Sequence, residues 1–288
     1  MMSFTAPEQI HFNVLGLKLA AQRWHEGGIP VIALHGWLDN SESFAPLAAC
    51  MPTVDLVALD LAGHGWSDHR AAHAGYLIWD DLREILAVAD ALGWQRFGVL
   101  GHSRGAIIGA LLAAAAPQRV AALGLIDGLW AKTCAADKMP VQMARSLQQE
   151  HDKPANSGQP VFLSLDDMVQ MRVRSGFPLS EAAARQIVSR NTVQREGGWH
   201  WRTDPRHKLP SMVMLTPEQQ YACHRAIAAP VELALASNGL VLAYPDFAER
   251  LLDLPHINWS LHDGNHHLHM EGMQSILGSL YNRFFQRL

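Results

Sequence analysis

The sequence predicts an α/β fold with a mostly parallel central sheet and helices on both faces. Short, continuously apolar runs alternate with helical stretches, as they do where parallel strands are buried on both sides. The 288 residues and 49% hydrophobic content are enough for one large domain with a sizeable core, or for a domain that carries an insertion.

The expected elements follow in chain order. Residues 10–24 predict a strand pair broken at Gly16. Helices are expected over 76–92, where apolar residues recur with a helical period, and over 106–116, which Pro117 closes. Buried strands are expected over six apolar runs, namely 30–34, 54–61, 96–100, 120–126, 231–236 and 257–261.

The alternation of strands and helices breaks between Gly128 and Pro230. This stretch contains no clear buried strand, and its helical periodicity is centred on 139–149, 165–174 and 180–190. An insertion between two strands of a sheet most simply forms a lid at one edge of that sheet. We therefore expect a core of residues 1–128 and 230–288 and a helical cap of residues 129–229.

Charge and cysteine content restrict the partners. The net charge is −4 and no dense Lys/Arg cluster occurs, which argues against nucleic acid or an anionic membrane as a partner. The three cysteines are scattered, which favours a reducing compartment. No apolar run is long enough to span a bilayer, and the first residues lack a secretory pattern. A cytoplasmic protein with a small-molecule substrate is expected.

The stretch Gly101-His102-Ser103-Arg104-Gly105 joins an expected strand to an expected helix. A serine between two glycines at such a junction is typical of a nucleophile elbow, a strained turn that holds the hydroxyl out at the tip of the strand. Glycines are needed there because β-carbons would clash. The spacing alone is a weak signal, but its place between strand and helix favours a catalytic Ser103.

Two backbone groups are candidates for binding the oxyanion that forms on the attacked carbonyl. His35-Gly36-Trp37 follows the strand over 30–34, and the N–H of Trp37 can face the serine. The second donor is the N–H of Arg104, the residue after the nucleophile. The Arg104 guanidinium is expected to pair with a carboxylate of the cap, or alternatively to meet an acidic group of the substrate.

A histidine cluster after the last expected strand offers the general base. His266, His267 and His269 lie in the stretch 263–271, and histidine titrates in the range that such a base needs. Metal ligands and solvated loop histidines are the alternatives. Adjacent loop residues rarely point to one centre, which disfavours a metal. His64 is expected to hold a turn, and His102 is expected to pack under the elbow.

Together these motifs resemble those of the α/β-hydrolase superfamily, and most closely those of serine hydrolase-like proteins. The resemblance covers most of the chain, in the stretches HGWLDNSESF (35–44), LDLAGHGWSDHR (59–70), ALGWQRFGVLGHSRG (91–105), VAALGLIDG (120–128), GGWHWRTDPR (197–206) and GNHHLHME (264–271). It implies an α/β-hydrolase fold with a helical cap inserted after the strand that ends at Asp127. The family's catalytic histidine commonly lies five residues before a glutamate; here Glu271 indicates His266 and leaves His269 a structural role.

The acid departs from the pattern of the family. Relatives usually carry it after the strand that follows the cap, which here is near Gly239, where no carboxylate occurs. Some members take it from the end of the strand that leads into the cap, which here is Asp127. We expect Asp127 to orient His266 and stabilise its charged form. Asp246 is an alternative, as is a dyad or another carboxylate such as Asp263.

Ser103, His266 and an oxyanion hole imply a serine hydrolase that cleaves an ester or related acyl bond through an acyl-enzyme. No cofactor and no metal are expected. Some methionines and tryptophans of the cap are expected to line an apolar pocket above the serine, namely among Met139, Met143, Met168, Met171, Met212, Met214, Trp130, Trp199 and Trp201. Two alternatives stay open: a protein of this fold that binds without turnover, or a cofactor-free non-hydrolytic enzyme.

Overall fold

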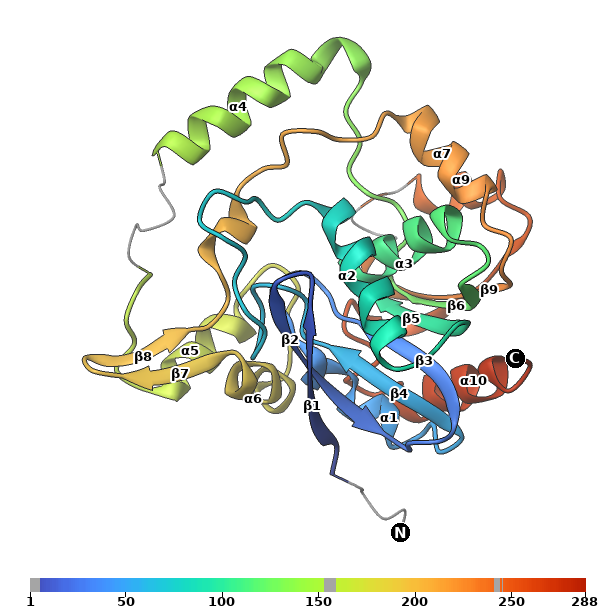
Figure 1. Ribbon diagram of the computed structural model, residues 1–288, viewed down its shortest axis with the longest axis horizontal. Coiled ribbons are helices and arrows are strands. Elements are labelled where there is room, and N and C mark those ends of the chain that lie inside the picture. Colours follow the sequence, from blue (N-terminus) through green and yellow to red (C-terminus); the bar gives the residue numbers. More distant parts are fainter. Residues whose placement is uncertain (1–5, 153–158, 241–243, 245) are drawn as a thin grey trace.

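The computed structural model describes residues 6–152, 159–240, 244 and 246–288. Eight strands form the central sheet in the order β1-β2-β4-β3-β5-β6-β9-β10 (Figure 1). Pairs from β4 through to β10 are parallel, and β1–β2 and β2–β4 are antiparallel, which confirms the mostly parallel sheet. The strands are β1 (Glu8–Val14), β2 (Leu17–Trp24), β3 (Ile29–Leu34), β4 (Val54–Leu59), β5 (Phe97–His102), β6 (Val120–Ile126), β9 (Val231–Asn238) and β10 (Ile257–Asn265).

The expected break between the first two strands falls on a two-residue turn. Leu15 and Gly16 have φ angles of 51° and 79°. Positive φ at both positions matches the twist of the flanking strands. Two strands are longer at their carboxyl ends than the apolar runs predict. β5 extends to His102 and β10 extends to Asn265. Backbone pairing therefore continues past the apolar residues, up to the polar ones that follow them.

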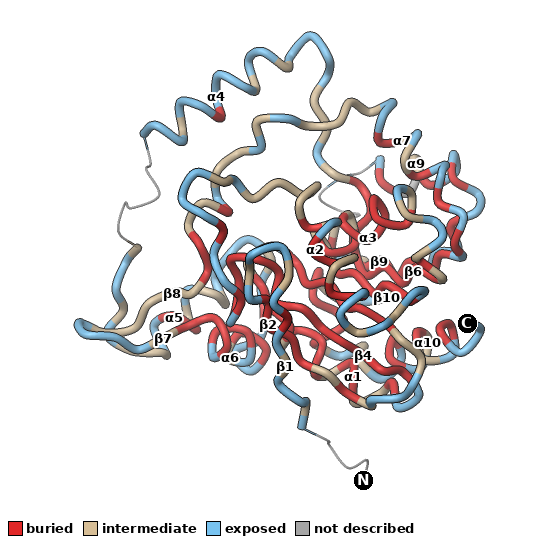
Figure 2. Tube along the Cα trace, in the orientation of Figure 1, coloured by how far each residue is buried: buried red, intermediate tan, exposed pale blue. Residues whose placement is uncertain are grey.

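Helices cover both faces of the sheet. Side chains alternate along β3, so that Ile32 and Leu34 join one apolar cluster while Val31 and Ala33 join the other. The first cluster includes residues of α2 (Ile78–Ala91), α3 (Arg104–Ala115) and α9 (Phe247–Leu251). The second includes residues of α1 (Ala45–Ala48) and α10 (Gln274–Phe285). Figure 2 shows the buried strands between these two layers.

The segment between β6 and β9 contains the expected helices and a hairpin that was not expected. The hairpin strands β7 (Thr192–Arg195) and β8 (Gly198–Trp201) are mostly half-buried or exposed, so they carry no buried-strand signal. The insertion is therefore not purely helical. In Figures 1 and 2, α4 (Met139–Asp152) stands apart from the other elements and is largely exposed. The remaining elements are α4 (Met139–Asp152), α5 (Leu165–Val173), α6 (Glu181–Arg190) and α7 (Pro217–Arg225), with short 3-10 turns η1 (Ser41–Phe44), η2 (Ala136–Lys138) and η3 (Pro205–Lys208).

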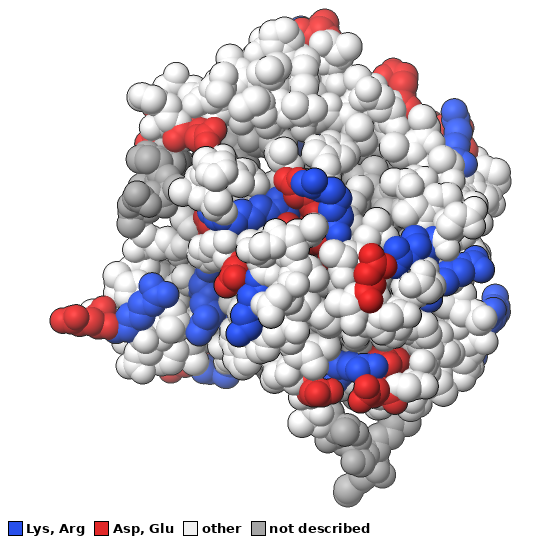
Figure 3. Space-filling model, in the orientation of Figure 1, with Lys and Arg blue, Asp and Glu red and all other residues white. Residues whose placement is uncertain are grey.

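Charged side chains of both signs are interspersed over the face drawn in Figure 3. In the part of the chain that the structure describes, no helix is both long enough and apolar enough to cross a membrane. The three cysteines, Cys50, Cys134 and Cys223, are free.

Candidate active site

Ser103 lies at the sharp turn between β5 and α3. Its backbone has φ 52° and ψ −115°, a strained conformation for a residue with a side chain. A Cβ on Gly105 would overlap the carbonyl oxygen of Leu34, and one on Gly101 would lie 2.6 Å from the nitrogen of Ala106. Both glycines are thus required by close backbone approach, and the strained turn lifts the serine above the end of β5.

The structure brings Ser103, His266 and Asp127 together in one hydrogen-bonded row. His266 directly follows β10, and its Nε2 lies 2.9 Å from the Oγ of Ser103. Its Nδ1 lies 2.6 Å from the Oδ2 of Asp127. Since a carboxylate accepts, Nδ1 carries the proton and Nε2 is left to accept one from the serine. His266 is 3% exposed and Asp127 is fully buried.

Asp127 follows β6 and is held by the end of β9 and the turn that follows it. Its Oδ1 accepts a hydrogen bond of 3.0 Å from the backbone N–H of Ala236, and its Oδ2 accepts one of 3.0 Å from that of Leu240. These donors satisfy a buried carboxylate in its charged form. A Cβ on Gly239 would overlap Oδ2. The carboxylate thus fills the space beside the position where relatives usually carry their acid.

The alternative acids lie elsewhere. The side chain of Asp246 is 60% exposed and its nearest cationic partner is Arg250, at 3.8 Å. Asp263 accepts a hydrogen bond of 3.1 Å from the hydroxyl of Ser237. Among the described residues, Asp127 is the carboxylate that contacts His266.

The three histidines of the C-terminal cluster are buried, so the alternative of solvated loop histidines is wrong. His266, His267 and His269 are 3%, 2% and 0% exposed. His102 packs beneath the elbow as expected, and its Nε2 donates a hydrogen bond of 2.8 Å to the backbone oxygen of His266. The ring of His269 lies 4.2 Å from that of His102, and burial holds the pKa of both rings well below the ordinary value. Both are neutral packing groups at pH 7.

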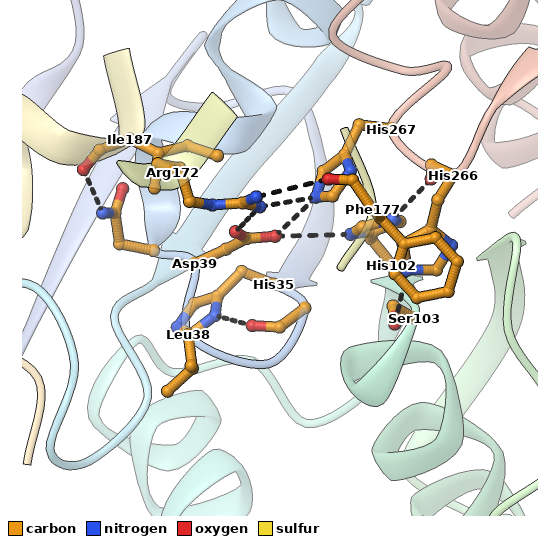
Figure 4. A network of polar contacts seen from close by, with 12 residues as sticks. His35, Leu38, Asp39, His102, Ser103, Arg172, Phe177, Ile187, His266 and His267 are labelled. Carbon is orange, nitrogen blue, oxygen red and sulfur yellow. Dashed lines mark hydrogen bonds and ion pairs between the residues drawn. The ribbon is translucent and has the colours of Figure 1, made fainter. Parts of the chain in front are cut away.

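A second polar group, which the sequence did not predict, adjoins this row (Figure 4). Asp39 lies in the loop after β3, and its carboxylate is 2.9 Å from the guanidinium of Arg172 and 3.1 Å from Nε2 of His267. Burial alone would raise the pKa of the Asp39 carboxyl, but His267 and Arg172 together hold it well below its ordinary value. Asp39 of the core and Arg172 of the insertion thus form an ion pair that joins these two parts of the chain.

The same group contains the one metal-like arrangement found among the described residues. Ligand atoms of Asp39, His102 and His267 lie within 4.8 Å of one another. The guanidinium of Arg172, 2.9 Å from Asp39 and 3.2 Å from His267, already supplies a cation there. This set shares only His267 with the trio that the sequence had offered as metal ligands.

The loop after β3 is fixed by His35. Its Nδ1 donates a hydrogen bond of 2.7 Å to the carbonyl of Gly36, and its Nε2 accepts one of 3.0 Å from the N–H of Leu61. The N–H of Asp39 donates to the same carbonyl at 3.2 Å. In a planar trans peptide the C=O and N–H point in opposite directions. The N–H of Trp37 therefore points away from His35, on the side of the loop that lines the same cavity as Ser103.

The guanidinium of Arg104 pairs with the core and not with the insertion, so the expectation of a cap carboxylate was wrong. Its partner is Asp81 of α2, at 2.6 Å. Asp81 also accepts from Arg70 at 3.0 Å, and Arg70 lies 2.8 Å from Glu84. These charges meet because α2 packs beside α3, a contact that spacing along the chain does not reveal.

A cavity of about 580 Å³ opens above Ser103 and His266. Of the methionines and tryptophans predicted to line a pocket, Met171 and Trp201 do so, whereas Met168 is fully buried in the packing of α5 and α6. Phe177 lies on His266 with the ring centres 4.0 Å apart. The cavity is therefore lined both by the core and by the segment between β6 and β9.

The parallel sheet, the serine turn after β5 and the histidine after the last strand define the α/β-hydrolase fold. Residues 29–161 match the family model described as the alpha/beta hydrolase fold. The chain belongs to the α/β-hydrolase superfamily and is similar to serine hydrolase-like proteins.

Three similar proteins illustrate this. A serine hydrolase-like protein of Danio rerio is 28% identical over 93% of this chain and 85% of its own length. Serine hydrolase-like protein 2 of Homo sapiens is 28% identical over 81% of this chain and 76% of its own. The crystal structure of a hypothetical protein from Pseudomonas aeruginosa PAO1 is 39% identical, with a TM-score of 0.92, covering 97% of this chain and all of that one. Fold and relatives together support a hydrolase.

Proposed function

We propose that the protein is a serine hydrolase that cleaves the ester or related acyl bond of a partly hydrophobic small molecule. The observation that carries this proposal is the row from Ser103 Oγ to His266 Nε2, at 2.9 Å, and from His266 Nδ1 to Asp127, at 2.6 Å. Such a row makes a hydroxyl nucleophilic at neutral pH. The mostly apolar lining of the cavity, which includes Met171 and Phe177, suits a substrate with a hydrophobic part.

The proposed reaction has two halves. Ser103 Oγ attacks the carbonyl carbon while its proton passes to His266 Nε2, and the backbone N–H groups of Trp37 and Arg104 bind the resulting oxyanion. The carbon–leaving-group bond then breaks and the leaving group takes the proton from His266. Water, deprotonated by His266, attacks the acyl-enzyme; the carboxylic acid leaves and the proton returns to Ser103. Asp127 keeps the imidazole oriented and stabilises its charged form throughout.

We also propose that residues 129–229 form a cap over this site. The core beneath the cap consists of residues 1–128 and 230–288. The cavity takes part of its lining from each, and Arg172 of the insertion is paired with Asp39 of the core. A cap that covers His266 excludes water from the charged steps, which strengthens the electrostatic terms there.

The test is covalent labelling with a fluorophosphonate, followed by a series of p-nitrophenyl esters of graded acyl length. We expect labelling of the native protein but not of Ser103→Ala or His266→Ala, and turnover that peaks at one chain length. Asp246→Asn serves as the control variant, because this exposed carboxylate lies away from the site. A folded protein that neither takes the label nor hydrolyses any ester of the series would overturn the proposal.

A further inference from the structure

A smaller cavity of about 290 Å³ lies beside the one above Ser103, and basic side chains contribute to its lining. We call it the cationic side cavity; its lining includes Arg195, His200 and Arg202 of the β7–β8 hairpin together with His69 and Gln159. In Figure 3, Lys and Arg side chains lie along this hairpin and towards the centre of the molecule. The proposed reaction uses none of these five lining residues.

The register of the hairpin gathers its basic residues on one side. Val193 pairs with His200 and Arg195 pairs with Gly198, and the N–H of Arg202 donates to the carbonyl of Asn191 at 2.7 Å. Since side chains two apart share a face of a strand, Arg195, His200 and Arg202 lie on the same face. Two permanent cations and an imidazole therefore converge on this cavity.

These cations have no carboxylate of their own. Among the described residues neither Arg195 nor Arg202 forms an ion pair, and the sequence contains no Asp or Glu in the stretches outside the description. Arg202 donates one hydrogen bond, of 3.1 Å, from Nε to the carbonyl of Thr192. Burial lowers the pKa of Arg202, and Arg195 lowers it further. The two outer nitrogens of the half-buried Arg202 guanidinium are thus available to donate hydrogen bonds to a ligand.

Two buried acids near this cavity are bound by other arginines, and Asp204 also lies 3.3 Å from His69 of the lining. Asp204 lies 2.6 Å from Arg206. Asp60 lies 2.9 Å from Arg190. Because each of these two carboxylates has its own arginine partner, neither forms an ion pair with Arg195 or Arg202, whose charges stay available to a ligand. An anion that entered would gain charge-assisted hydrogen bonds without displacing a carboxylate.

The side cavity and the catalytic cavity adjoin each other. Gln159 and Trp201 line both, so one elongated molecule can extend from Ser103 past these two side chains to Arg202. We propose that the cationic side cavity binds a carboxylate or phosphate at the end of the substrate remote from the bond that Ser103 attacks. This deepens the proposed function and rests on it: the substrate is an anionic acyl compound, with its hydrophobic part between the charge and the scissile bond.

The first test measures binding without turnover. Isothermal titration calorimetry of Ser103→Ala protein at low salt compares hexyl phosphate, heptanoate and hexanol. We expect the anions to bind at least about tenfold more tightly than hexanol, and Arg202→Gln to remove that advantage. The stronger of the two anions identifies the group that the cavity recognises. Equal binding of all three, or an advantage that survives Arg202→Gln, would overturn the proposal.

Two further variants control for folding and for net charge. Arg195→Gln changes an exposed side chain of the same face and is expected to weaken anion binding in the same direction. Arg225→Gln removes one exposed positive charge from the last turn of α7, and is expected to leave the affinities unchanged. If Arg225→Gln weakened binding as much as Arg202→Gln, only the overall charge would matter and the site would be refuted.

The second test links the side cavity to the reaction. Hexyl phosphate should inhibit hydrolysis of p-nitrophenyl butyrate competitively in the native protein, and about tenfold more weakly in Arg202→Gln. If esters are hydrolysed but the anions neither bind nor compete, the anion site fails while the hydrolase stands. If no ester is hydrolysed but the anions still bind through Arg202, the hydrolase fails while the anion site stands.

Discussion

The carboxylate of Asp127 lies directly against Gly239, so close that any β-carbon at position 239 would overlap its Oδ2. The two positions, one directly after β6 and one directly after β9, therefore compete for one volume beside His266. A carboxylate can enter that volume from either strand, but not from both. This explains why the chain has no acid near Gly239, where relatives usually carry theirs.

Asp127→Asn should lower kcat by about 10⁴, since an amide cannot stabilise the charged imidazole and favours the wrong tautomer. Hydrolysis of the best p-nitrophenyl ester measures the effect, with circular dichroism as the check on folding. Asp246→Asn should stay near the native rate because its side chain is 60% exposed and away from His266. A large loss in Asp246→Asn with a small one in Asp127→Asn would refute the assignment.

Moving the acid to the neighbouring strand should restore part of the activity. Position 127 has φ 40°, which glycine adopts without strain, so Asp127→Gly vacates the carboxylate volume at little backbone cost. We expect the double variant Asp127→Gly, Gly239→Asp to be at least about tenfold more active than Asp127→Gly alone. Gly239→Asp alone should be less stable than the native protein, because two carboxylates would then share one buried volume. Equal activity of the single and double variants would contradict this competition.

His35 should act on the rate although it does not touch the substrate. Its Nδ1 holds the carbonyl of Gly36, and the N–H of Trp37 points the opposite way in that peptide plane. We expect His35→Ala to lower kcat by about 10–100-fold with little change in KM, which is less than the loss of a whole oxyanion donor. His25→Ala, at a half-buried histidine bonded to the carbonyl of Ala48, is the matched control. A purely structural role would instead lower the unfolding midpoint and spare kcat.

The row of catalytic candidates was predictable because each member carries a local signal. Ser103 lies between two glycines at a strand end, and His266 and Asp127 directly follow strands. The carboxyl ends of parallel strands meet at one edge, so strand order alone places these three near one another. Asp127 was chosen as the acid because no carboxylate occurs near Gly239, and no sequence pattern of its own marks this residue.

Other parts of the site had no signal along the chain. Arg172 and Asp39 are 133 residues apart, and neither position differs in the sequence from an ordinary exposed charge. The partner of Arg104 was misplaced for the same reason, since Asp81 comes from the packing of α2 beside α3. The β7–β8 hairpin was not predicted because its half-exposed strands, as in GGWHW, lack a buried apolar run.

Arg172→Gln should lower the free energy of unfolding by about 3–5 kcal/mol, because it leaves the buried carboxylate of Asp39 without its arginine. Urea denaturation measures the loss. Adding Asp39→Asn should recover most of it, since the double variant buries no unpaired charge. Arg174→Gln, an exposed arginine at the end of the same helix, is the control. Additive losses in the double variant would show that the two residues do not interact.

Glu84 should make stability depend on pH. Burial raises the pKa of its carboxyl from 4.5 to about 7, against the opposing effect of Arg70. The folded state thus binds this proton more tightly than the unfolded chain does. The stabilisation is fully present below pH 4.5 and is lost as the pH rises through 7, by at most about 3 kcal/mol.

The measurement is the free energy of unfolding in urea at pH 5, 6, 7 and 8 for the native protein and Glu84→Gln. Glutamine cannot titrate, so the difference between the two proteins should change in favour of Glu84→Gln as the pH rises, and level off above 7. Glu150→Gln, on an exposed position of α4, should run parallel to the native curve. A Glu84→Gln curve that also ran parallel would mean that Glu84 keeps an ordinary pKa, with Arg70 compensating fully for its burial.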